Sequence, residues 1–117
     1  MRRNRTPRVI VGVDGSLAGL RAIRVAVEQA RQRGAVLHAV RVWRFEPAWR
    51  GSPANWYRQT ETEAVDLITR AFDEAMGGVP DDVEVVTATP LGSPGRTLLD
   101  YAHGDDDLLV LGSGQRS

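Results

Sequence analysis

Two glycine-bearing polar loops hold the residues best suited to chemistry. Asp14-Gly15-Ser16 follows an apolar run that ends at Val13, and Gly112-Ser113-Gly114 follows a second apolar run late in the chain. Glycine lets a backbone approach a ligand closely, and free amides at a helix start favour anions. A carboxylate such as Asp14 accepts a hydrogen bond from a ribose hydroxyl or an exocyclic amine. Each loop alone is equally explained as an ordinary strand-to-helix turn, so the prediction of a nucleoside site depends on the pair.

Other kinds of chemistry find little support. Gly12, Gly15 and Gly19 do not fit the G-x-G-x-x-G dinucleotide spacing, and a chain without lysine has no G-x-x-x-x-G-K-[ST] loop. The absence of cysteine excludes disulfides, thiol nucleophiles and Cys-based metal sites. His38 and His103 have no second histidine or acid at ligand spacing, so we interpret both as structural. We therefore expect no metal of the chain's own and no enzyme.

The acidic run Asp105–Asp107 is the remaining metal candidate. Adjacent side chains diverge in direction, so we interpret this run as a solvated turn.

Composition and charge narrow the class further. The 117 residues suit one domain, with 42% apolar and 26% charged residues. No apolar run is long enough to span a membrane, and Arg2, Arg3 and Arg5 precede no apolar stretch, so a cytoplasmic location is expected. The net charge is zero, which argues against nucleic-acid binding. Residues 1–60 contain twelve arginines and three acidic residues, whereas residues 61–117 contain three arginines and twelve acidic residues.

The elements that must position the two loops alternate strictly. Short apolar runs predict strands, and runs of 3.6-residue periodicity predict amphipathic helices. Such alternation predicts a parallel sheet with helices on both faces, the first and fourth strands central and the more polar third strand at an edge. Ligands of such sheets bind beyond the carboxyl ends of the strands. Strands are predicted at residues 8–13, 36–43, 83–89 and 108–111, and helices at 17–33, 60–76 and 94–103.

A long stretch at residues 44–59 is predicted to be irregular. The region 43–57 contains all three tryptophans, together with Phe45 and Tyr57. Long loops without regular structure are often lids or binding loops. A loop folded onto the domain to bury its rings explains the same pattern.

The sequence resembles the universal stress protein (UspA-like) family. The resemblance rests on the opening Ile10-Val11-Gly12-Val13-Asp14-Gly15-Ser16 and the closing Asp107-Leu108-Leu109-Val110-Leu111-Gly112-Ser113, and it covers nearly the whole chain from Arg8. It implies a flavodoxin-like (Rossmann-like) three-layer α/β domain with strand order 3-2-1-4-5. We also expect a disordered basic tail at residues 1–7, and the use of arginine without any lysine indicates a bacterial source. The resemblance also implies a homodimer or another protein partner, and ATP as ligand in one branch of the family.

Carried over by position, the resemblance assigns roles to the two loops. Asp14 would bond the adenine–ribose region, Val42 would meet adenine through its backbone, and Gly112 would begin the phosphate loop. The candidate nucleotide-binding residues are Val13, Asp14, Gly15, Ser16, Val42, Gly112, Ser113 and Gly114.

Two departures from the family pattern concern the phosphate loop. Gln115 stands at the family's second glycine position, and the final Gly-Ser/Thr pair, last helix and fifth strand do not follow Ser117. We therefore expect a C-terminally incomplete domain of strand order 3-2-1-4 in which ATP binding is weak or lost. The alternative is an interaction module that dimerises with an empty crevice. Slow ATP hydrolysis ranks third, because no general base is visible.

Overall fold

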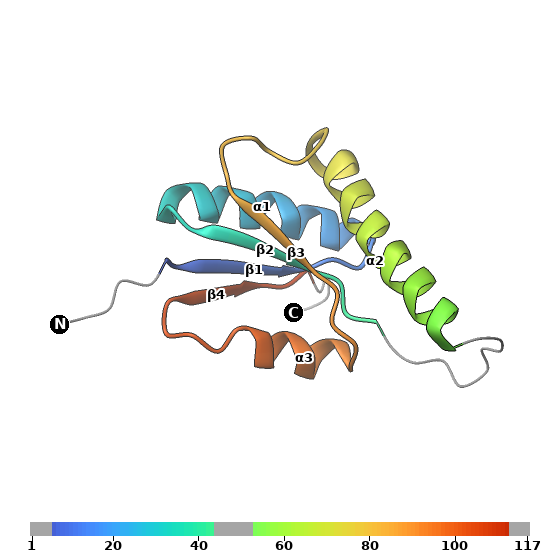
Figure 1. The fold of residues 1–117 in the computed structure, drawn as a ribbon. Helices are drawn as coiled ribbons and strands as arrows, with labels where there is room; N and C mark the ends of the chain where they lie inside the picture. The colour runs from blue at the N-terminus through green and yellow to red at the C-terminus, as the bar shows by residue number, and fades with distance from the viewer. Residues whose placement is uncertain (1–5, 44–52, 113–117) are drawn as a thin grey trace.

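A four-stranded parallel sheet lies between two helical layers in the computed structural model, which describes residues 6–43 and 53–112 (Figure 1). The strands run in the order β3-β2-β1-β4, as the sequence predicts. Helices α1 and α2 cover one face of the sheet and α3 lies on the other (Figure 1). The elements are β1 (Arg8–Gly12), α1 (Leu17–Arg33), β2 (Val36–Val40), α2 (Pro53–Met76), β3 (Val85–Ala88), α3 (Pro94–Tyr101) and β4 (Asp107–Val110).

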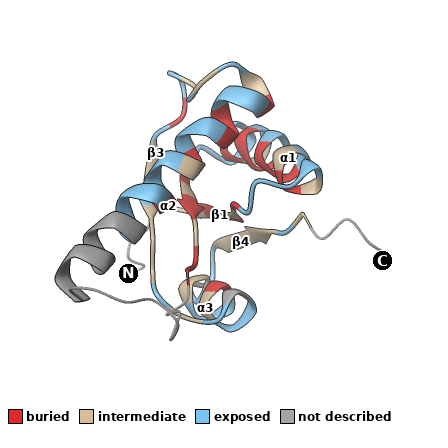
Figure 2. Cartoon of the chain, turned by 90° about the vertical axis from the view of Figure 1, so that its right-hand side faces the viewer, coloured by how far each residue is buried: buried red, intermediate tan, exposed pale blue. Residues whose placement is uncertain are grey.

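The continuous apolar sequence of β1 reflects burial on both of its faces. Val9, Ile10 and Val11 are all fully buried. Because side chains alternate along a strand, Val9 and Val11 pack on the α1–α2 side while Ile10 packs on the α3 side. On the first side the core includes Phe72 of α2, also fully buried. Figure 2 shows the buried residues of α1 and α2 on the sides that face the sheet.

Helix α1 begins and ends where the sequence predicts. The Ser16 hydroxyl accepts a hydrogen bond from the Gly19 amide at 3.0 Å, which satisfies one amide of the first turn. Gly34 ends the helix with φ of 61°, a left-handed conformation that favours glycine. The Ser16 cap thus holds the start of α1 directly behind the loop that carries Asp14.

Helix α2 begins earlier than the sequence predicts. It starts at Pro53, so the expectation that residues 53–59 are irregular is wrong. Proline suits the first turn of a helix, where its missing N–H is not needed, and no further proline or glycine follows it before Gly77. The rest of the predicted irregular stretch, residues 44–52, lies outside the described residues, as does most of the predicted tail at residues 1–7. No helix in the described segments combines the length and hydrophobicity needed to cross a bilayer.

The aromatic region 43–57 runs into α2, which contains Trp56 and Tyr57. Trp43 is 7% exposed, and its indole N–H donates to the carbonyl oxygen of Thr89 at 2.7 Å. This tryptophan is therefore a core residue, as expected if the region buries its rings. Trp49 lies outside the described residues.

The edges of the sheet depart from the prediction in one respect. β3 lies at an edge, as expected from its polar residues. β4 lies at the other edge and all four of its residues are only half-buried, so the expectation of a central fourth strand does not hold among the described residues.

Asp107 is not part of a solvated turn. It opens β4 in register with Arg8, its side chain is 6% exposed, and it forms an ion pair with the Arg8 guanidinium. The interpretation of Asp105–Asp107 as a solvated run is wrong for this residue, because the parallel register brings a cation beside it.

Candidate functional site

The two polar loops open at the same edge of the sheet. β1 and β4 are parallel neighbours, with Val11 in register with Val110. The residues that follow each strand, Asp14 and Gly112, consequently line one pocket. The side-by-side arrangement on which the sequence argument depends is present.

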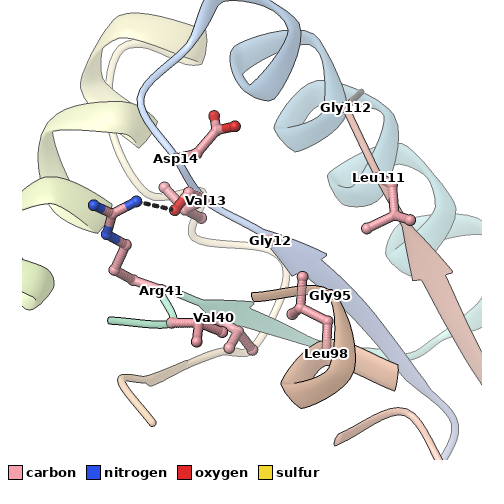
Figure 3. Close-up of a pocket in the computed structure, with 10 residues that line it drawn as sticks. Gly12, Val13, Asp14, Val40, Arg41, Gly95, Leu98, Leu111 and Gly112 are labelled. Atoms are coloured by element: carbon pink, nitrogen blue, oxygen red, sulfur yellow. Dashed lines mark hydrogen bonds between the residues drawn. The ribbon is translucent and has the colours of Figure 1, made fainter. Parts of the chain in front are cut away.

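This carboxyl-end pocket has a volume of about 370 Å³, within the usual range of small-molecule sites. It is bounded by the ends of β1, β2 and β4 and by the first turns of α3 (Figure 3). Its lining residues are Gly12, Val13, Asp14, Val40, Arg41, Val42, Gly95, Leu98, Leu111 and Gly112.

The floor of the carboxyl-end pocket is apolar. Leu98 of α3 is 9% exposed and packs with Val40 and Val42 of the β2 region. A Cβ atom on Gly12 would lie 2.8 Å from Leu98 Cδ1, so the glycine permits this close approach of helix and strand. The result is a surface suited to the flat face of an aromatic ring.

Asp14 is oriented by the residue that caps α1. Its Oδ1 accepts the Ser16 amide at 2.9 Å and the Ser16 hydroxyl at 2.7 Å. No residue in the described part of the chain donates to Oδ2. One carboxylate oxygen therefore fixes the side chain, while the other is available to a donor on a ligand. Gly15 and Ser16 do not line the pocket themselves; they form the turn that presents Asp14, with Gly15 at φ of 79°.

The backbone at Val42 offers a donor and an acceptor side by side. The Val40 carbonyl accepts from the Val13 amide at 2.9 Å, on the β1 side, whereas the amides of Arg41 and Trp43 donate to the segment that follows β3. Because polar groups alternate along an extended chain, the N–H and C=O of Val42 point to the β1 side. There β1 has already turned towards α1, and neither group has a hydrogen-bond partner among the residues described.

Gly112 lies against the first turn of α1. A Cβ atom at this position would overlap the carbonyl oxygen of Ala18 and would lie 3.0 Å from Ala22 Cβ. Glycine is therefore required where β4 passes the helix. Ser113 and Gly114, the other predicted members of this loop, lie outside the described residues.

Six lining residues were not predicted from the sequence: Gly12, Val40, Arg41, Gly95, Leu98 and Leu111. Arg41 donates to the carbonyl oxygen of Val13 at 3.4 Å, which links the end of β2 to the end of β1 (Figure 3). The signal for Gly95 and Leu98 was their position in the first turns of a helix that follows β3. That signal does not reveal which face of the sheet the helix covers.

Metal ligands do not gather anywhere in the described part of the chain: no three histidine or acidic side chains lie close enough to hold an ion.

Known proteins with the same architecture are universal stress proteins. The universal stress protein UspA from Lactobacillus plantarum aligns with a TM-score of 0.64 and 26% identity, over 98% of this chain and 86% of that chain. A universal stress protein crystallised in complex with cAMP aligns with a TM-score of 0.63 and 26% identity, over 89% of this chain and 74% of that one. A universal stress protein from Archaeoglobus fulgidus, 23% identical over 97% of this chain and 80% of its own, shares the fold with a TM-score of 0.59.

Sequence comparison points the same way. No curated protein matches the chain significantly. The sequence model of the Universal stress protein family, however, matches residues 6–117, nearly the whole chain. The chain belongs to the universal stress protein family.

Proposed function

We propose that this protein is a non-catalytic regulatory module of the cytoplasm that binds an adenine nucleotide in its carboxyl-end pocket. The observation that carries the proposal is that Asp14, the unpartnered backbone groups of Val42, and Gly112 meet at one pocket with an apolar floor. The ligand class is supported by the cAMP complex of a family member that is 26% identical to this chain.

The groups around the pocket complement the parts of an adenine nucleotide. Adenine presents an acceptor, N1, beside a donor, the N6 amine, and these match the N–H and C=O of Val42. The flat face of the base would lie on Val40 and Leu98, and a ribose hydroxyl would donate to Asp14 Oδ2. The phosphate groups would then lie towards Gly112, the start of the predicted phosphate loop.

A regulatory role fits the pocket better than catalysis. Asp14 is the only acid among the ten lining residues, and no histidine lines the pocket. A single carboxylate already bonded to its own loop is a poor general base, and no second group is placed to act as its partner. We propose that the bound nucleotide acts by changing the association of the domain with a second copy or with another protein.

Calorimetric titration with ATP, cAMP and adenosine tests this proposal. We expect saturable binding that Asp14→Ala weakens at least about tenfold, the loss of roughly one charge-assisted hydrogen bond. Asp105→Ala, which removes an exposed aspartate that precedes β4 and does not line the pocket, serves as the matched control. Absence of binding at millimolar nucleotide, or equal affinity for the Asp14→Ala variant, would overturn the proposal.

A second candidate, an interaction module that dimerises without nucleotide, is favoured by exposed apolar side chains on α3 and just after β4. Leu99 and Leu111 are 65% and 59% exposed, and the outer edge of β4 is unpaired among the described residues. Exposed strand edges pair readily with other chains. Sedimentation of the protein with and without nucleotide distinguishes the two candidate functions. A stable dimer whose dissociation constant is the same in both conditions would support this second candidate.

A further inference from the structure

A polar cluster lies at the end of α3 opposite the pocket. The Nδ1 atom of His38, on β2, lies 2.8 Å from the hydroxyl of Tyr101, the last residue of α3. The two rings meet edge to face, with centroids 5.6 Å apart. The carbonyl oxygen of Tyr101 accepts from Arg8 Nη2 at 2.8 Å, and the Arg8 guanidinium lies 5.3 Å from the centre of the tyrosine ring. The last turn of α3 is thus attached to both β2 and β1.

Asp107 holds Arg8 in place for this contact. Its carboxylate accepts from Arg8 Nε at 3.0 Å and from Arg8 Nη2, and it also accepts the Gly104 amide at 2.8 Å. Because Arg8 and Asp107 are in register on neighbouring strands, the guanidinium that reaches Tyr101 belongs to the rigid sheet.

The other attachment of α3 is a single apolar side chain. Leu98 is the buried residue among the described side chains of this helix, whereas Leu99 is largely exposed. Leu98 and Gly95 are also the two residues by which α3 closes the pocket. The position of this pocket wall therefore depends on Leu98 near its middle and on Tyr101 at its end.

We propose that His38 and Tyr101 are positioning residues for the nucleotide site: their hydrogen bond sets the position of α3 while His38 is uncharged, so that protonation of His38 weakens ligand binding. The affinity part of this inference rests on the proposed function above. With its proton on Nε2, an uncharged imidazole accepts a hydrogen bond from the tyrosine hydroxyl at Nδ1, whereas a protonated imidazole has no lone pair and can only donate. Protonation therefore reverses the hydrogen bond, with the tyrosine hydroxyl as acceptor, and adds a positive charge that Arg8 repels. Because Arg8 also bonds the carbonyl oxygen of Tyr101, we expect this repulsion to shift the end of α3.

Four charged or titratable groups face His38 from the elements around it. They are Tyr101 of α3, Arg8 of β1, Asp107 of β4 and Glu84, which precedes β3. Burial and the positive charge of Arg8 lower the pKa of His38, and the two carboxylates oppose this without reversing it. In the folded protein, His38 therefore stays uncharged down to a lower pH than an exposed histidine does.

Two histidine variants separate this inference from a merely structural role. The chain has two histidines, and His103 is exposed, so His103→Gln is a matched control for His38→Gln. The probe is cAMP, because a phosphate monoester such as AMP itself titrates at about pH 6. The dissociation constant is measured by calorimetry from about pH 5 to about pH 8, the range in which histidine titrates.

We expect the wild-type protein and His103→Gln to lose about fivefold in affinity towards the acid end, the lower end of ordinary coupling between sites. His38→Gln, which stays uncharged, should bind with the same affinity across the range. Tyr101→Phe should bind more weakly at neutral pH and should also lose the dependence. A pH profile that His38→Gln retains, or that His103→Gln abolishes, would overturn the inference.

A ligand-free measurement keeps this inference distinct from the proposed function. The amide resonance of Gly95 is followed by NMR during a pH titration without nucleotide. We expect its chemical shift to change with the pKa of His38, and this change to vanish in His38→Gln. If no nucleotide binds but Gly95 follows His38, the proposed function fails and the coupling stands. If Gly95 does not respond, the coupling is wrong even if nucleotide binds.

Discussion

The backbone of Gly112 lies directly against the carbonyl oxygen of Ala18, so that no side chain fits between the end of β4 and the first turn of α1. This contact brings the second polar loop beside the first. It also makes Gly112 a test of how tightly the pocket is built.

We expect Gly112→Ala to destabilise the fold by about 1–3 kcal/mol, the usual cost of overpacking against atoms that cannot move aside. Gly95→Ala is the matched control, because a Cβ there meets nothing within 4 Å and alanine suits a helix better than glycine. Urea denaturation measures both. Equal free energies of unfolding for the two variants would contradict this prediction, because they would show that the backbone around Ala18 adjusts to the added Cβ atom without loss of stability.

Ser16→Ala removes a helix cap and the group that orients Asp14. We expect a loss of about 0.5–2 kcal/mol in the free energy of unfolding, together with weaker nucleotide binding. Ser93→Ala is the control, since Ser93 occupies the N-cap of α3 but makes no side-chain capping bond. A loss of stability as large in Ser93→Ala as in Ser16→Ala would contradict this prediction.

The two aspartate–arginine pairs of the described residues should differ in their contribution to stability. Asp107→Asn weakens a largely buried carboxylate's bonds to Arg8, and we expect a cost of about 1–2 kcal/mol. Asp82→Asn alters the exposed pair with Arg31, and we expect no measurable change. Thermal denaturation of both variants checks the comparison, which fails if Asp82→Asn is the more destabilised.

As the pH is lowered, the free energy of unfolding should decrease in two separate pH ranges. The pKa of His38 is lowered on folding, so the unfolded chain binds the extra proton and stability is lost as pH falls below the ordinary value of 6.5. The Arg8 guanidinium lowers the pKa of Asp107, so its contribution is present above 3.8 and is lost as pH falls towards the folded value. His38→Gln should remove the first decline and leave the second. Denaturant midpoints of both proteins, measured as the pH is lowered through the two ranges, check this prediction. It fails if His38→Gln keeps the first decline.

The arrangement of the sheet could be predicted because the sequence carries strong local signals. The buried run around Ile10, the Ser16 and Gly34 caps of α1 and the polar residues of β3 each indicate their own place. Parallel topology then brings the ends of β1 and β4 to the same edge, and with them Asp14 and Gly112.

What could not be predicted depends on contacts between distant segments. Asp107 looked like one of three solvated acids, and only the register of β4 with β1 pairs it with Arg8. Leu98 and Gly95 looked like ordinary helix residues, because no local pattern states which helix face closes a pocket. Arg41 could not be predicted because only the tertiary fold brings its guanidinium to the carbonyl oxygen of Val13.

The two faces of the sheet are unequally protected, and this has a consequence for how the molecule opens. Two long helices insulate one face, whereas one short helix shields the other in the part of the chain described. Local unfolding begins where the fewest apolar contacts must be broken. Transient excursions of the native state should therefore detach α3 first, so that a ligand can enter and leave without disturbing the platform formed by β1, β2 and α1.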